Sequence, residues 1–260
     1  MTTAQRTPTP TVIPIILKEF DDFETEGTKF LAGDTPERQF IGFRLKQGVY
    51  GQRQQARQMT RVKVPFGGLG PEQMEGFAQV SEIAPLNKGH ITTRQCVQFH
   101  HIPLVEMYQV LRILGDHGLS SREACGNVVR NVTGDPWAGV RDDELFDITP
   151  YAGAFVRYWV RNTLSQLLPR KFKVTFSGSD ADAALTPMHD IGFTPRIKVI
   201  DGKEVRGFKM VVGGGLSTMA KEAALLTEFV PVEKFLTYSD AVIFVRQRSE
   251  EHTSELQSHA

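Results

Sequence analysis

The sequence predicts an α+β fold made of two successive units. Stretches in which apolar and polar residues alternate, such as Arg57–Val64, are followed by stretches with apolar residues three and four apart, such as Pro71–Ile83. The chain has 260 residues, of which 40% are hydrophobic, and this is enough for one large or two small domains. No apolar stretch approaches the roughly 20 residues that a membrane span needs, so we expect no membrane contact.

The first 40 residues are expected to lie outside the first unit. Repeated Thr-Pro steps within residues 1–15 indicate a flexible leader, and the mixed charges of residues 16–40 indicate a helix or an arm. Residues 41–120 contain two strands, each followed by a helix: Arg57–Val64, Pro71–Ile83, His90–Phe99 and Leu104–His117. This order with antiparallel pairing is typical of a ferredoxin-like α+β sandwich, here a half-domain.

Both helices of this half-domain have recognisable ends and apolar faces. Pro71 fits the first turn of a helix, and Met74 begins an apolar stripe with Phe77 and Val80. The second helix should be closed by Gly115 or Gly118. We interpret its apolar stripe as core, with four side chains pointing inward: Leu104, Met107, Leu111 and Leu114.

Residues 121–247 are expected to form a second, α/β unit. Thr149-Pro150 begins a long helix that reaches Leu164, and Asp201-Gly202 is a hairpin turn. Three strands are expected, at Lys171–Ser177, Arg196–Ile200 and Gly207–Val212. Two helices should follow, near Thr218–Phe229 and Pro231–Gln247.

The most informative stretch is the strand after Pro169, because this proline bars a helix from continuing. Alternation places Lys171 and Lys173 on one face of the strand and Phe172 on the other. Two ammonium groups at this spacing repel each other, so we expect an anion over them. The alternative is a solvated face or an edge strand protected by its charge.

The same pattern recurs in the first unit. Arg61 and Lys63 alternate with Val62 and Val64 on their strand. On the next strand, five polar side chains are expected to share one face: Thr92, Arg94, Cys96, Gln98 and His100.

Two segments of the second unit are further candidates for binding an anion. Arg130 lies in a polar, turn-like stretch. Gly213–Gly215 follow a strand, and glycines in such a place let a backbone approach a ligand closely or bind an anion through N–H groups. The formal net charge is zero, from 30 basic and 30 acidic residues, and the exposed aromatic residues of RNA-binding sheets are absent. A small polyanion in a pocket therefore fits better than a nucleic acid.

Five segments that carry these residues resemble, in order, the signature segments of the sulfite and nitrite reductase haemoprotein family: Met59–Gly68, Thr92–His101, Asn127–Val132, Leu168–Lys173 and Gly207–Ser217. The similarity runs from about Gly42 to about Val245 and covers only the first of the family's two pseudo-symmetric halves. It implies a sirohaem-binding domain after the half-domain. It also implies sirohaem coupled to a [4Fe–4S] cluster, and the carboxylates of sirohaem would be the missing anion.

The resemblance also implies an activity, partners and roles for residues. The activity is six-electron assimilatory reduction of sulfite, or of nitrite, with electrons from ferredoxin or an NADPH-flavoprotein. Independently of the resemblance, two unpaired-looking cysteines and no signal peptide indicate a reducing cytoplasm. Four cations match positions that bind the substrate and deliver protons: Lys63, Arg130, Lys171 and Lys173. The positions that hold the macrocycle and its carboxylates are matched by Arg61, Thr92, Arg94, Gln98, His100, Gly213, Gly214 and Gly215.

The cysteines do not follow the family's pattern. Cys96 and Cys125 are the only two in the chain, whereas a [4Fe–4S] cluster needs four thiolates, which the family supplies from Cys-x5-Cys and Cys-x3-Cys motifs. We therefore assign no metal ligand and expect the chain to be inactive without the missing C-terminal half. The alternative is a non-catalytic half-protein that binds a tetrapyrrole or another polyanion.

The C-terminal residues differ in character from the rest. Arg248 begins a run, Arg-Ser-Glu-Glu-His-Thr-Ser-Glu-Leu-Gln-Ser, that resembles the translation of a sequencing-adapter oligonucleotide. We expect residues 248–260 to be an artefactual tail. The alternative is an ordinary polar tail.

Overall fold

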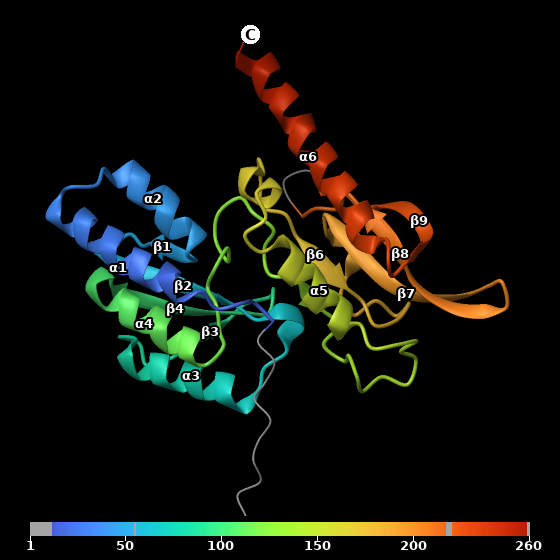
Figure 1. Cartoon of the computed structure of the whole chain (residues 1–260), viewed down its shortest axis with the longest axis horizontal. Helices are drawn as coiled ribbons and strands as arrows, with labels where there is room; N and C mark the ends of the chain where they lie inside the picture. The colour runs from blue at the N-terminus through green and yellow to red at the C-terminus, as the bar shows by residue number, and fades with distance from the viewer. Residues whose placement is uncertain (1–11, 55, 217–219, 259–260) are drawn as a thin grey trace, which may run out of the picture. The chain divides into compact units, whose positions relative to one another are not determined.

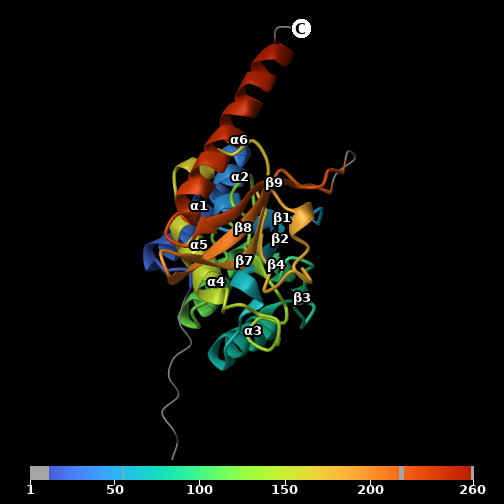
Figure 2. The ribbon, with the colours of Figure 1, turned by 90° about the vertical axis from the view of Figure 1, so that its right-hand side faces the viewer.

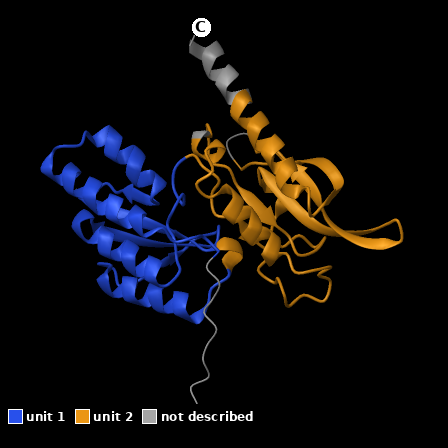
Figure 3. Cartoon of the chain, in the orientation of Figure 1, with its two compact units in different colours: residues 1–64, 68–126 blue, residues 65–67, 127–260 orange. Residues whose placement is uncertain are grey.

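The computed structural model describes residues 12–54, 56–216 and 220–258, which form two compact units (Figures 1 and 3). Unit 1 comprises Met1–Val64 and Gly68–Gly126, and unit 2 comprises Pro65–Gly67 and Asn127–Ala260. Each unit has its own sheet. None of the helices among the described residues combines the length and the apolar character needed to cross a bilayer.

Unit 1 is an antiparallel four-stranded sheet with helices packed on it, and this confirms the α+β class and the ferredoxin-like half-domain. The strand order is β1-β2-β4-β3. The strands are β1 Val49–Gly51, β2 Arg57–Lys63, β3 His90–Ile91 and β4 Cys96–Pro103. The helices are α1 Leu17–Ala32, α2 Glu37–Lys46, α3 Pro71–Ile83 and α4 Leu104–Asp116.

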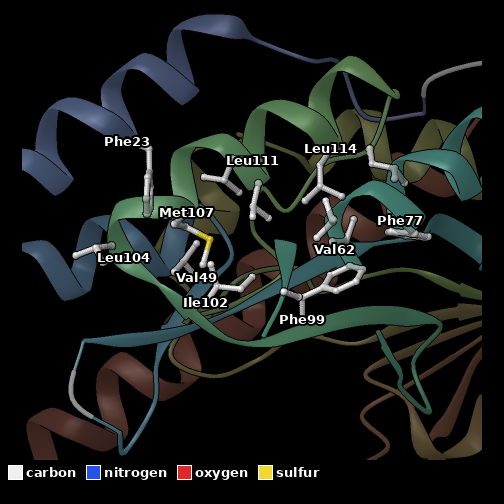
Figure 4. Packing of buried hydrophobic residues seen from close by; sticks show 14 of the residues in the cluster. Phe23, Val49, Val62, Phe77, Phe99, Ile102, Leu104, Met107, Leu111 and Leu114 are labelled. Carbon is white, nitrogen blue, oxygen red and sulfur yellow. The ribbon is translucent and has the colours of Figure 1, made fainter. Parts of the chain in front are cut away.

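One hydrophobic core joins all four helices of unit 1 to its sheet. Met107 and Leu111 of α4 lie over Val62 and Phe99 of the sheet (Figure 4). From the N-terminal helices, Phe23 and Phe40 are buried, and the Phe40 ring stacks on Phe30 at a centroid distance of 4.4 Å. Residues 16–40, expected as a helix or an arm, therefore form integral helices of this core.

Two details of unit 1 differ from the sequence-based expectations. Met74 was expected in the core but is 54% exposed, because the buried face of α3 runs through Gly76, Phe77 and Val80 instead. The expected strand His90–Phe99 is a hairpin of β3 and β4. The Thr92 hydroxyl accepts the backbone N–H groups of residues 94 and 96, which closes a turn within the segment.

Unit 2 is built on a five-stranded mixed sheet with the order β5-β6-β7-β8-β9. The strands are β5 Thr133–Gly134, β6 Val174–Phe176, β7 Ile191–Ile200, β8 Lys203–Val212 and β9 Ala224–Pro231. Strand β6 runs parallel to β5 and β7, while β8 is antiparallel to both β7 and β9. The turn between β7 and β8 is at Asp201-Gly202, as predicted, with φ of 52° and 73°.

Helices α5 Thr149–Trp159 and α6 Phe235–Ser258 complete unit 2 (Figure 2). Its core is aromatic: Phe176 and Phe193 stack at a centroid distance of 4.6 Å, and Phe155 and Phe235 pack edge-on against them. Three short 3₁₀ turns connect the elements: η1 Pro65–Gly67, η2 Leu164–Leu167 and η3 Thr186–Met188.

Three expectations for unit 2 were wrong. The helix from Thr149 ends at Trp159, because the next residues leave the helical region and residue 161 has a φ of 64°. The segment expected as a helix near Thr218–Phe229 contains strand β9, and its residues 218 and 219 lie outside the described residues. The last helix continues beyond Gln247 to Ser258.

Candidate anion-binding site

A pocket of about 520 Å³ lies in unit 2, around the strand segment that precedes β6. Other parts of unit 2 complete its wall: residue 127, the segment from the end of η3 to the residue before β7, the glycine turn after β8, and α6. The lining residues are Asn127, Pro169, Arg170, Lys171, Lys173, Met188, Asp190, Gly214, Gly215, Leu216 and Arg246.

The two lysines reach this pocket because the chain is extended between them. Lys171 and Lys173 both line the pocket, whereas Phe172 between them is buried on the other side. The Phe172 backbone bonds to the neighbouring segment: its N–H donates to Val128 at 3.1 Å, and its carbonyl accepts from Arg130 at 2.9 Å. The alternation expected from the sequence is therefore present.

The pocket is strongly cationic. Arg170, Lys171, Lys173 and Arg246 line it against the single carboxylate of Asp190. Four like charges around one cavity raise the electrostatic energy of the fold unless an anion compensates them. The arrangement thus favours a ligand with several negative charges.

Two of these cations, and Asp190, could not be assigned from alternation alone. Arg170 lies next to the lysine strand, but Arg246 comes from α6, more than seventy residues further along the chain. The residue before Asp190 does not reach the pocket lining: His189 is buried, and its Nδ1 lies 2.8 Å from the Leu185 carbonyl oxygen.

The glycine turn does not bind an anion through its N–H groups, contrary to one of the two expectations. Gly213 donates to the carbonyl of Asp190 at 3.0 Å, Gly214 to that of His189 at 2.9 Å, and Gly215 to that of Lys221 at 2.9 Å. The close approach at Gly214 is made by protein backbone, since a Cβ there would collide with the Pro187 carbonyl oxygen.

Arg130 occupies a different position from the lysines. Its side chain is 5% exposed, and it is not among the residues that line the pocket. Its segment was expected to be turn-like, but Val129 forms a parallel bridge with Phe172. Arg130 therefore lies on the chain segment that supports the lysine strand.

In unit 1, the predicted basic face lies on β2 and β4. Arg61 is opposite Gln98 and Lys63 is opposite Cys96. With the Gln98 amide oriented to satisfy its neighbours, its oxygen accepts two hydrogen bonds from the Arg61 guanidinium, one of them from Nε at 2.8 Å. The guanidinium also lies over the Tyr50 ring, 5.9 Å from its centroid.

Thr92 and Arg94 do not lie on this strand face as expected. They belong to the β3–β4 turn, where the Thr92 hydroxyl accepts the N–H groups of Arg94 at 3.3 Å and Cys96 at 3.1 Å. The role of Thr92 in the structure is therefore to hold the turn that presents Arg94.

Burial and nearby charges shift the pKa values of two residues on this face, Cys96 and His100. Burial raises the pKa of the Cys96 thiol, although the nearby cations Arg61, Lys63 and Arg94 act in the opposite direction. Burial also lowers the pKa of His100, and His101, His90 and Arg61 lower it further. His100 is thus kept neutral near pH 7, with its Nδ1 3.3 Å from the Gln52 amide nitrogen.

Of the two expected cofactors, sirohaem fits the residues of this chain and the [4Fe–4S] cluster does not. The carboxylates of sirohaem suit the cations of the unit 2 pocket. Among the residues that the structure describes, no group of three His, Cys, Asp or Glu side chains is placed to hold a metal ion. Cys96 and Cys125 are both buried, and two thiols cannot provide the four thiolates of a [4Fe–4S] cluster, so the cluster does not fit this chain by itself.

Two protein families match consecutive parts of the chain. The nitrite/sulfite reductase ferredoxin-like half domain matches residues 50–117. The nitrite and sulphite reductase 4Fe-4S domain matches residues 125–255, which includes part of the expected artefactual tail. The first match covers about half of unit 1 and the second covers most of unit 2.

Individual relatives agree with these matches. An assimilatory ferredoxin-dependent nitrite reductase of Haloferax mediterranei is 31% identical over 229 residues, covering 83% of this chain and 39% of the relative. A sulfite reductase [ferredoxin] of Mycobacterium tuberculosis is 34% identical over 174 residues, covering 67% of this chain and 30% of the relative. The structure of M. tuberculosis NirA protein matches with a TM-score of 0.75 and 27% identity, covering 88% of this chain and 45% of that one. The chain thus spans less than half the length of these relatives.

Proposed function

Because the chain belongs to the nitrite and sulfite reductase family, we propose that it serves the assimilatory six-electron reduction of sulfite to sulfide, with nitrite as the alternative substrate. The observation that supports this most is the pocket with Arg170, Lys171, Lys173 and Arg246. Sulfite and nitrite are anions, and so is the carboxylate-rich sirohaem. Bound sirohaem would supply the electrons to the substrate.

The lysines of the pocket serve two purposes in this proposal. Lys171 is exposed and Lys173 is half-buried, so both ammonium groups can reach a ligand. They attract the anion and, as each oxygen leaves, they donate protons to it. Arg130 is also proposed as a cation of the substrate site. Its backbone N–H donates to the Phe172 carbonyl, which holds its segment beside the lysine strand.

The unit 1 face is proposed to hold the carboxylates of the macrocycle. Arg61 and Arg94 provide charge, while Gln98 orients Arg61 and Thr92 holds the turn of Arg94. Neutral His100 offers a ring nitrogen without adding charge. Lys63 is 4% exposed and is proposed as the unit 1 cation of the substrate site.

We further infer that the chain alone does not catalyse the reaction. Its two cysteines cannot hold the cluster, and the relatives it matches are more than twice as long as the part they share with it. The electron donor is proposed to be ferredoxin or an NADPH-dependent flavoprotein, since both kinds of enzyme occur among the relatives. A reducing cytoplasm suits the two free cysteines.

A second candidate function also follows from the presence of only two cysteines. In this alternative, the chain is a non-catalytic half-protein that binds a tetrapyrrole or another polyanion. Both candidates need the cationic pocket, and they differ in whether sulfite is reduced once the missing residues are supplied.

Titration of the purified chain with uroporphyrin, a porphyrin rich in carboxylates, tests the shared part of the proposal. Binding followed by absorbance should weaken about tenfold or more in the double variant K171A/K173A, because two of the four pocket cations are lost. The matched control is K198A/K203A, which removes two lysines from the exposed part of the β7–β8 hairpin. Equal binding by all three proteins would refute the pocket as the anion site.

A second assay separates the two candidates. The chain is supplied with sirohaem and a chemical reductant, alone and together with a polypeptide containing the family's four-cysteine motifs. Sulfide formed only in the mixture supports the reductase. No sulfide in the mixture favours the non-catalytic alternative, and sulfide formed by the chain alone would disprove the inferred inactivity.

A further inference from the structure

Among the described residues that line the pocket, Asp190 carries the one carboxylate, beside four cations, and its hydrogen bonds connect it to the lysine strand. Its Oδ2 accepts the backbone N–H of Lys173 at 2.8 Å. It is half-buried in the position immediately before β7, beside the strand segment that carries the two lysines. The carboxylate therefore contacts the lysine strand through its backbone.

This hydrogen bond replaces a missing rung of the parallel sheet. Strand β6 pairs with β7 from Val174 and Ile191 onward, and the Lys173 carbonyl accepts the Ile191 N–H at 3.2 Å. In a regular parallel ladder the Lys173 N–H would donate to the carbonyl of His189. That carbonyl instead accepts the N–H of Gly214 at 2.9 Å, so the Asp190 side chain takes its place for Lys173.

The same residue also holds the glycine turn. The Asp190 carbonyl accepts the Gly213 N–H at 3.0 Å, next to the bond from Gly214 to His189. Asp190 thus joins two walls of the pocket, the lysine strand by its side chain and the glycine turn by its backbone. Removing the carboxylate would leave the Lys173 N–H without its acceptor at the position where the sheet ends.

We propose that Asp190 is a positioning residue, which extends the sheet by one hydrogen bond and so fixes the Lys173 ammonium toward the anion in the pocket. The inference rests on the proposed function for the identity of the anion, but the placement of Lys173 is independent of it. A carboxylate that acted only through its charge would oppose anion binding. A carboxylate that positions Lys173 supports binding despite its charge.

Two substitutions separate these roles. In D190N the amide oxygen still accepts the Lys173 N–H, while the negative charge is removed. In D190A both are removed. Uroporphyrin binding is therefore expected to be equal to wild type or a few-fold tighter in D190N, and about tenfold weaker in D190A. The matched control is D180A, which removes an exposed carboxylate that pairs with Arg196 outside the pocket, and it should bind as wild type does.

Hydrogen exchange of the Lys173 amide gives a readout that needs no ligand. Protection should be present in the wild type and D190N and lost in D190A. Tighter binding in D190A than in the wild type would overturn the proposal, since charge alone would then explain Asp190. Loss of binding in D190N equal to that in D190A would overturn it as well, because the conservative variant should rescue.

These readouts keep the inference separate from the proposed function. If the wild type does not bind uroporphyrin, the proposed function fails, while unchanged Lys173 exchange across the variants would refute the positioning role. If D190A does not fold, exchange in D190N decides: a protected Lys173 amide supports the proposal and an unprotected one refutes it.

Discussion

Replacing Gly214 by alanine is expected to destabilise unit 2 by about 2–4 kcal/mol. A Cβ at this position would collide with the Pro187 carbonyl oxygen and lie 2.8 Å from the carbonyl oxygen and 2.9 Å from the nitrogen of His189. All three are backbone atoms, so relief requires the chain to move. Overpacking of this kind costs about 1–3 kcal/mol. Weakening the Gly214 hydrogen bond to His189 adds about 0.5–1.5 kcal/mol.

Gly215 provides the matched control for this experiment. A Cβ at Gly215 meets no described atom within 4 Å, and its N–H bond to Lys221 is unaffected by an added methyl group. Gly215→Ala should therefore change stability by less than about 1 kcal/mol, in either direction. Urea unfolding of the two variants and the wild type measures the difference. A loss below about 1 kcal/mol in Gly214→Ala would refute the tight backbone contact at the pocket wall.

Three further predictions concern other parts of the chain. The pKa of His100 is lowered in the folded state, so the unfolded state takes up a proton at this residue first as the pH drops. The free energy of unfolding should therefore fall below a pH of about 6.5. The substitution His100→Gln should reduce that fall. Both cysteines should resist iodoacetamide at pH 7 until the chain unfolds, since they are buried and the pKa of the Cys96 thiol is raised; rapid labelling would contradict this. Deleting residues 248–260 should leave the melting temperature unchanged if these residues are artefactual. Re-sequencing the gene beyond the codon for Arg246 should then reveal the cysteine motifs.

Periodicity predicted the helices and several strands of the fold because the signals for them are local. The start of α3 and the β7–β8 turn follow from Pro71 and Asp201-Gly202, whose backbone preferences are strong. Periodicity did not predict the turn at Thr92, because a side-chain hydroxyl there accepts a backbone N–H group and interrupts the strand. It also failed for β9, because pairing with β8 decides the conformation of residues 224–231 and no local signal shows that pairing.

The candidate site was predictable in the same uneven way. Alternation placed Lys171 and Lys173 on one face because their spacing alone determines it. Arg246 and Asp190 reach the pocket only through tertiary structure, from α6 and from the position immediately before β7. The glycines suggested free N–H donors, but Gly213 and Gly214 donate to carbonyls more than twenty positions earlier in the chain, and Gly215 donates to the Lys221 carbonyl six positions later.

The cationic pocket has a consequence for stability as well as for binding. Four cations around one carboxylate repel one another in the absence of ligand, so a bound polyanion should stabilise the folded chain. At a free concentration of 100 times its Kd, a ligand that binds only the folded state adds about 2.7 kcal/mol. For a chain of this size that corresponds to a rise in Tm of about 5–10 °C.

Thermal melts with and without uroporphyrin measure this rise. It should be largely lost in K171A/K173A and kept in K198A/K203A, and it should shrink as salt screens the charges. The variant K171A/K173A should itself melt no lower than the wild type without ligand, because it relieves repulsion in the pocket. An equal rise in Tm in all three proteins would show that the porphyrin binds outside the pocket. Lys171 and Lys173 would then not be an anion-binding pair.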